Sequence, residues 1–191
     1  MGETISDLIQ HLETYLGEIS SGYPHDDNGA KLPFQIVRFE NAPPNTTTLV
    51  TLGLSKVGLR AGETTKRIRQ EFLMTMNAEW NPKNLPAVLH QIATEAYAKD
   101  EAYLRGQFIG PRGHLVEGTA MEALYVSIPI YFPDDFHVYT PPTGDPIVLV
   151  WVIPITAAEA HYVNEHTWEA FEDLLEKTNP DLRDLGRASV V

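Results

Sequence analysis

The feature that most constrains the fold is an apolar run around residue 150. Residues 147–155 read Ile-Val-Leu-Val-Trp-Val-Ile-Pro-Ile, with no alternation of apolar and polar side chains. A strand with one wet face would alternate, so this run predicts a strand covered on both faces, near the centre of a sheet, with Trp151 in the core. Thr156 and Glu159 follow in capping-box spacing, which predicts a helix that begins directly after the strand.

The remaining periodicities predict an α+β fold: a mixed, mainly antiparallel central sheet flanked by helices. Helices are expected within 1–20, at about 84–96 and at 157–177, the last one broken near 166–167; strands are expected at 34–39, 46–55, 68–77, 114–118, 123–131 and 147–155. No linker divides the chain. We therefore expect one domain over residues 1–191, with an N-terminal helix at 1–20 and a main body at 34–191.

The charge balance argues against nucleic acid as a partner. The chain has 26 acidic and 14 basic residues, for a net charge of −12. A nucleic-acid binder needs a cationic surface to displace counterions from phosphates, and the basic cluster at 66–69 alternates with apolar residues as a strand face does. The negative field instead favours a basic protein partner, because it steers such a partner to the surface.

The absence of cysteine excludes disulfides, thiolate zinc sites and cysteine nucleophiles. No apolar run reaches the length of a membrane span, and the N-terminus lacks the basic start of a secretory signal. We therefore expect a cytoplasmic protein that does not bind a membrane.

The patterns that suggest chemistry are weak. His161 and His166 flank Glu165, but zinc binding on a helix needs histidines four residues apart, and these are five apart, roughly 140° around the helix axis. Ser55 could join His90 or His114 in a catalytic triad, but a nucleophile elbow needs glycine on both sides, and here Gly53 is matched by Val57. We expect no metal, no cofactor and no catalysis; a hydrolase using Ser55 or a His/Glu site remains the alternative.

Several stretches together resemble the Suppressor of fused family in its compact bacterial form. They are the strand and helix start at 151–159, the tail Asp184-Leu185-Gly186-Arg187-Ala188-Ser189, the Gly53-Leu54-Ser55 turn, the strand at 71–75, and Trp80 followed by Leu85-Pro86. Their order along the chain, from about residue 34 to the end, carries the resemblance.

The resemblance implies an α+β sandwich without catalytic residues. Animal members bind and restrain a zinc-finger transcription factor, and a second, C-terminal domain helps to clamp a partner peptide as an added strand. We expect that clamp to be absent here, because the chain stops after its Arg-x-Ser tail. Bacterial members resemble immunity proteins, which neutralise a cognate toxin by binding it. We expect that role, with a general adaptor or regulator of a transcription factor as the alternative.

Five residues are candidates for partner binding. In the family the partner peptide lies near the loop after the Gly-Leu-Ser strand, which begins here at Lys56 and Val57. Trp80 fits an interface anchor and a core residue equally well. Asp184 and Arg187 either hold the tail in place or contact the partner. We expect a monomer or a weak homodimer.

Overall fold

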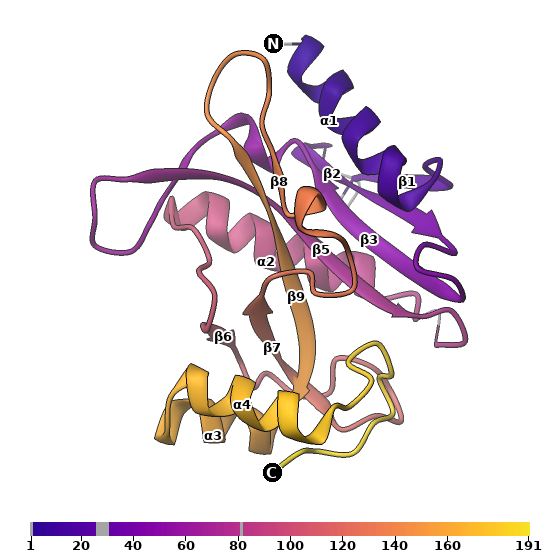
Figure 1. The fold of residues 1–191 in the computed structure, drawn as a ribbon, viewed down its shortest axis with the longest axis vertical. Coiled ribbons are helices and arrows are strands. Elements are labelled where there is room, and N and C mark those ends of the chain that lie inside the picture. The colour runs from indigo at the N-terminus through magenta and orange to yellow at the C-terminus, as the bar shows by residue number, and fades with distance from the viewer. Residues whose placement is uncertain (1, 26–30, 81) are drawn as a thin grey trace.

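The computed structural model describes residues 2–25, 31–80 and 82–191 (Figure 1). Its elements follow the chain as α1 (Gly2–Leu16), β1 (Ser21–His25), β2 (Lys31–Glu40), β3 (Thr46–Leu52), β4 (Leu59–Arg60), β5 (Arg67–Asn77), α2 (Leu85–Lys99), β6 (Phe108–Ile109), β7 (Met121–Ser127), β8 (Val138–Tyr139), β9 (Ile147–Thr156), α3 (Ala157–Glu165) and α4 (Trp168–Thr178). Short 3₁₀ turns lie at Leu54–Lys56 and Asp134–Phe136. Across the described residues, no helix combines the length and apolar character needed to cross a bilayer.

The strands form one sheet in the order β1-β2-β3-β5-β9-β7-β6, with β4 paired to β5 and β8 paired to β9. Among the described strands, β5 and β9 are the one parallel pair, with residues 69–73 opposite 147–151. All other pairs are antiparallel. The mixed, mainly antiparallel sheet of the sequence prediction is confirmed.

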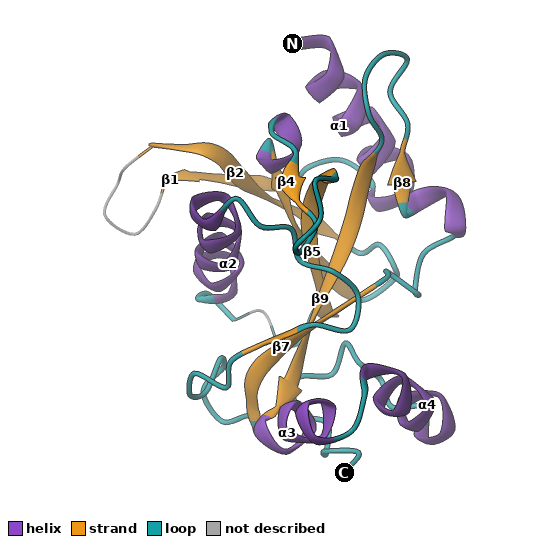
Figure 2. Cartoon of the chain, turned by 90° about the vertical axis from the view of Figure 1, so that its left-hand side faces the viewer, coloured by secondary structure: helices purple, strands orange, loops and turns teal. Residues whose placement is uncertain are grey.

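Each face of the sheet carries its own apolar core. Leu85, Leu89 and Ile92 of α2 pack on one face, and the apolar sides of α1, α3 and α4 pack on the other. Figure 2 shows α2 on one side of the strands and α1 and α4 on the opposite side. Helices on both faces explain the unbroken apolar run of β9, in which Trp151 is 1% exposed, as predicted.

The junction between β9 and α3 has the predicted capping box. The Thr156 hydroxyl accepts from the Glu159 N–H at 3.1 Å, and the Glu159 carboxylate accepts from the Thr156 N–H at 2.8 Å. The predicted break near His166 is also confirmed. Thr167 caps α4 by accepting a hydrogen bond from the Ala170 N–H at 3.2 Å.

Five short elements differ from the sequence prediction. The expected strand at 114–118 is wrong: the Thr119 N–H donates to the Val116 carbonyl, and the segment forms a turn before β7. The sequence prediction missed β1, β4, β6 and β8, which have two to five residues each and which hydrogen bonds to longer neighbouring strands hold in place.

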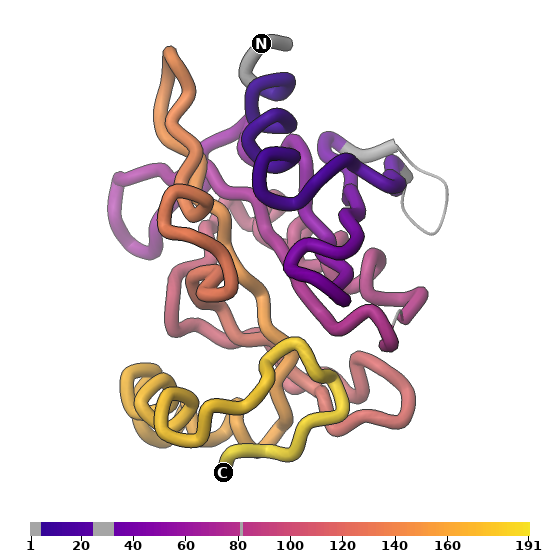
Figure 3. Tube along the Cα trace, turned by 45° about the vertical axis from the view of Figure 1, so that its right-hand side comes forward, coloured from indigo at the N-terminus to yellow at the C-terminus, as the bar shows by residue number. Residues whose placement is uncertain are grey.

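The sheet forks where β5 and β9 separate. Their pairing ends at Leu73 and Trp151; beyond it β5 stays with β3 and β9 stays with β7. The C-terminal tail, residues 181–191, lies across this fork (Figure 3). The Asn77 N–H of β5 donates to the Arg183 carbonyl at 2.9 Å, so the tail satisfies a backbone donor that the fork leaves open.

Candidate functional site

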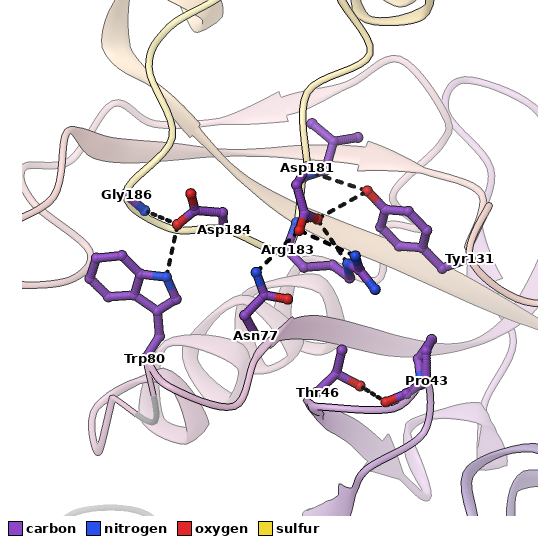
Figure 4. A network of polar contacts seen from close by, with 10 residues as sticks. Pro43, Thr46, Asn77, Trp80, Tyr131, Asp181, Arg183, Asp184 and Gly186 are labelled. Atoms are coloured by element: carbon purple, nitrogen blue, oxygen red, sulfur yellow. Dashed lines mark hydrogen bonds and ion pairs between the residues drawn. The ribbon is translucent and has the colours of Figure 1, made fainter.

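Trp80 and Asp184 are 104 residues apart in sequence and in direct contact in the structure (Figure 4). The indole Nε1–H of Trp80 donates to Asp184 Oδ1 at 2.9 Å, and the Gly186 N–H donates to the same oxygen at 2.8 Å. Gly186 lies so close to the indole that a Cβ on it would come within 2.5 Å of the ring. Trp80 therefore anchors the tail, and its side chain is partly buried.

The contacts between the tail (residues 181–191) and the rest of the fold are called here the tail seam. A second cluster on this seam centres on Asp181 (Figure 4). Its carboxylate accepts from Arg183 Nε at 2.8 Å and from Asn77 Nδ2 at 3.1 Å. The guanidinium of Arg183 also stacks on Tyr131, 4.6 Å from the ring centroid, and the Tyr131 hydroxyl accepts from the Leu182 N–H. Partial burial would raise the pKa of Asp181, but the hydrogen bonds from Arg183 and Asn77 outweigh it and lower the pKa to about 2.

Arg187 is buried at the far end of the tail. Its guanidinium donates to both carboxylate oxygens of Glu159, at 2.6 and 2.9 Å, and to the Pro154 carbonyl at 3.4 Å. Glu159 also caps α3 and accepts from the Val190 N–H at 3.1 Å. Arg187 is 8% exposed, so its side chain holds the tail against β9 and presents little surface to a partner.

Lys56 and Val57 lie elsewhere, in the turn between β3 and β4. Both are exposed, Val57 by 37%. The structure therefore brings three of the five candidates, Trp80, Asp184 and Arg187, onto the tail seam and leaves the other two on a separate surface.

The turn that carries Lys56 is built on a buried carboxylate that sequence reasoning missed. Glu71 is fully buried and accepts five hydrogen bonds: from the N–H groups of Gly53, Leu54 and Ser55, and from the hydroxyls of Thr51 and Ser55. Burial raises the pKa of Glu71, and these donors oppose the rise. Gly53 has φ 108°, which lets three successive N–H groups converge on the carboxylate.

The five donors around Glu71, called here the Glu71 cradle, include the Ser55 hydroxyl, so Ser55 is not placed to act as a nucleophile. Ser55 is fully buried, and its hydroxyl donates to Glu71 Oε1 at 2.6 Å. A nucleophilic serine needs access to substrate and a base that takes its proton, and here the hydroxyl is enclosed and serves a structural hydrogen bond.

The histidines of α3 do not form a metal site. His161, Glu165 and His166 are all exposed, and the His166 ring contacts the Tyr162 ring in a tilted arrangement, with ring centroids 4.2 Å apart. Within residues 2–25, 31–80 and 82–191, no three His, Asp or Glu side chains gather closely enough to hold a metal ion.

Around the Lys56 turn, exposed cations gather on an otherwise acidic chain. Lys56, Arg60, Lys66 and Arg67 are exposed on this turn and on the β4–β5 hairpin. Arg67 forms an ion pair with Asp100. Arg69 points back to the turn and donates to the Ser55 carbonyl at 2.7 Å. In the cluster at 66–69, Lys66 and Arg67 thus lie on a solvated strand face, as expected from the sequence. Arg69 instead supports the turn.

The fold is that of solved Suppressor of fused proteins. A homologue from Neisseria gonorrhoeae FA 1090 superimposes with a TM-score of 0.79 at 18% identity, covering 100% of this chain and 98% of that one. A chain of the Sufu–Fu complex crystal structure gives a TM-score of 0.71 at 16% identity, covering 97% of this chain and 91% of that one. Drosophila Suppressor of Fused gives 0.66 at 16% identity; the match covers 98% of this chain and half of the Drosophila chain.

The sequence agrees with the fold. The family model described as Suppressor of fused protein matches residues 31–188, and the chain belongs to this family. The resemblance seen in the motifs is thereby confirmed. No curated protein matches the chain in sequence.

Proposed function

We propose that this chain is a non-catalytic protein-binding domain, and that it acts as an immunity protein by neutralising a toxin that it binds. The observation that carries the proposal is membership of the Suppressor of fused family over residues 31–188. One solved structure similar to this chain is that of a Sufu–Fu complex, in which a Sufu chain meets another protein.

The reactive side chains of this chain support a binding role. Ser55 and Glu71 are hydrogen-bonded to each other in the turn before β4. Glu159 and Arg187 form the ion pair that holds the tail. Each of these groups is at least nine-tenths buried and paired inside the protein. Groups held this way stabilise a surface and are unavailable for turnover.

For the site of binding, we propose the Lys56–Val57 turn as the primary contact and the Trp80–Asp184 seam as a second one. Val57 offers an exposed apolar side chain on a turn that the Glu71 cradle makes rigid, and rigid apolar anchors favour binding because they lose little entropy. At Asp184, Oδ1 accepts from Trp80, and the second carboxylate oxygen points away from this contact (Figure 4).

The net charge of −12 supports a basic partner, since opposite charge raises the rate of encounter. The cations around Lys56 would then meet local acids on that partner. The chain would act in the cytoplasm, where a toxin that reaches or is made in the cell has to be neutralised.

The test is capture followed by neutralisation. The chain is expressed in its own cells with a tag at the N-terminus, because the C-terminal tail is packed into the fold. Captured proteins are compared with the products of neighbouring genes, and each candidate is expressed alone and together with the chain. The proposal predicts a growth defect that the chain relieves and that Lys56→Glu restores. A partner without toxicity would leave protein binding standing and remove the immunity role.

A further inference from the structure

The loop between β6 and β7 is tied to α2 at two points. At one, the Asn84 Nδ2–H donates to the Leu115 carbonyl at 2.5 Å. At the other, Arg112 pairs with Glu95, and its Nη2–H donates to Glu95 Oε2 at 2.9 Å. Asn84 and Glu95 are separated by roughly 16 Å along the helix axis, from the rise of 1.5 Å per residue. Between the two ties the loop does not close onto the helix, and a hollow remains.

This hollow has an apolar floor and a volume of about 250 Å³. Its floor consists of aliphatic side chains from α2 and from the sheet: Val88, Ile92, Ile109 and Leu124. The last three are buried, so they form the bottom of the hollow. Pockets for drug-sized ligands have volumes of roughly 300–1,000 Å³. The hollow therefore fits a smaller molecule with an apolar body.

The rim of the hollow presents amide oxygens without a protein donor. Asn84 turns its side-chain nitrogen to the Leu115 carbonyl. Gln91 turns its nitrogen to Glu95 Oε1, at 3.2 Å. Because a carbonyl or carboxylate oxygen can only accept, these contacts fix which end of each amide is the nitrogen. Asn84 Oδ1 and Gln91 Oε1 accept no hydrogen bond from any residue that the structure describes, so both remain available to a ligand.

The charge at the rim is negative. Glu122 of β7 lines the hollow, and its side chain is 30% exposed. The neighbouring cation, Arg112, is already paired with Glu95. His114 Nδ1 lies 3.4 Å from Glu122 Oε1, and this contact is an ion pair only when the imidazole is protonated. With a neutral imidazole, the Glu122 carboxylate has no counter-charge in the described part of the chain, and such a group favours a cationic hydrogen-bond donor.

We propose that this hollow, called here the α2–β7 pocket, binds a small organic amine. The apolar body of the amine covers Ile92 and Leu124, and its primary ammonium group lies at the rim. An ammonium group has three N–H donors and no acceptor, which matches the three unused acceptors of Asn84, Gln91 and Glu122. A carboxylate ligand would bring like charge against Glu122. The inference goes beyond the proposed protein binding and does not depend on it.

The test compares three small probes that share a phenyl ring: phenethylamine, phenethyl alcohol and hydrocinnamate. Each is titrated at neutral pH into the whole ¹⁵N-labelled chain, and the backbone and side-chain amide signals are followed. The amine should shift the signals of residues 84–92 and 113–115 and the side-chain amide of Gln91. A ligand of this size is expected to have a Kd of roughly 1 mM. The alcohol should bind at least fivefold more weakly, and the carboxylate should not saturate.

Two variants test the contacts within the pocket. Glu122→Gln should weaken amine binding at least fivefold and bring it level with the alcohol. Glu117→Gln removes an exposed carboxylate from the same loop and should change amine binding by less than about twofold. Val88→Phe places a larger side chain on the floor and should abolish binding of the amine, while thermal unfolding shows that the fold is retained.

Three results would overturn the α2–β7 pocket. One is equal affinity for the amine and the carboxylate, which would show unselective apolar binding. Another is an equal effect of Glu122→Gln and Glu117→Gln, which would show a general charge effect. The third is the absence of saturable shifts at residues 84–92 and 113–115 with the amine at about 10 mM, tenfold above the expected Kd. None of these results touches the proposed function, which fails separately, when capture from cells returns no partner that the purified chain binds.

Discussion

The carboxylate of Glu159 accepts hydrogen bonds from both terminal nitrogens of Arg187, 28 residues later, in a buried ion pair. The same carboxylate caps the helix that begins directly after the central strand. One side chain therefore joins β9, the start of α3 and the C-terminal tail. The Asp-x-x-Arg-x-Ser ending of the chain has a structural reason in this arrangement: Asp184 ties the tail to Trp80, and Arg187 ties it to Glu159.

Replacing Arg187 should destabilise the fold strongly. Arg187→Met leaves the Glu159 carboxylate buried without its counter-charge, which typically costs about 3–5 kcal/mol. Arg105→Met, which breaks the more exposed pair with Glu172, should cost no more than about 1 kcal/mol. Urea unfolding followed by circular dichroism measures both. A cost for Arg187→Met as small as that for Arg105→Met would show that the tail is not held by this pair.

Replacing the Glu71 carboxylate with an amide should lower the free energy of unfolding. Glu71→Gln keeps the shape but turns a donor toward the converging N–H groups of Gly53 and Ser55, at a cost of about 1–3 kcal/mol. Glu40→Gln, at an exposed position of β2, should change the free energy of unfolding by less than about 0.5 kcal/mol. Thermal unfolding of the two variants compares them directly. Equal stabilities would mean that the cradle does not need a carboxylate.

Acid should release the Asp181 cluster. The pKa of Asp181 in the folded chain is about 2, below its ordinary 3.8, so its ionised form favours the folded state. This contribution is complete above about pH 4 and is lost as the pH falls toward 2. Asp181→Asn should therefore be less stable than the unmodified chain at pH 5, and the gap should close toward pH 2. Urea midpoints measured across this range test the sign; a gap that stays constant with pH would contradict it.

Replacing Gly106 should lower stability more than replacing a glycine of similar φ that has open space around it. Gly106→Ala meets both the strain of φ 91° and the Trp168 ring, whereas Gly113→Ala, at φ 89°, has nothing within 4 Å of the new Cβ. The strain costs both variants about 1 kcal/mol, and the clash adds about 1–3 kcal/mol for Gly106→Ala. Chemical denaturation gives the difference. Equal losses would mean that Trp168 moves aside without cost.

Local signals in the sequence predicted the long elements well. The unbroken apolar run of β9, the capping box at Thr156 and the break before Trp168 each follow from neighbouring residues, and each is found where expected. β1 was missed because it contains serine, glycine and proline, which disfavour strands; its place comes from pairing with β2. The expected strand at 114–118 failed because a local turn satisfies its backbone instead.

In the candidate site, too, local sequence signals do not predict contacts that depend on the tertiary fold. Glu71 lies on a strand where alternation assigns it to a polar face, and only the tertiary fold reveals that this face is covered as well. The contacts of Trp80 with Asp184 and of Glu159 with Arg187 join residues 104 and 28 positions apart. Motif order indicated that these residues matter, but which side chains pair depends on how the tail lies across the fork.

We propose that the Lys56–Val57 turn belongs to a binding surface for one defined protein. The most direct measurement is calorimetric titration of the captured partner into the chain, into Lys56→Glu and Val57→Asp, and into the exposed control Lys99→Glu. We predict saturation at a fixed ratio for the unmodified chain and for Lys99→Glu, with at least tenfold weaker binding for the two turn variants. Equal affinities for all four proteins, or no saturable binding at all, would show that the Lys56–Val57 turn does not bind the partner.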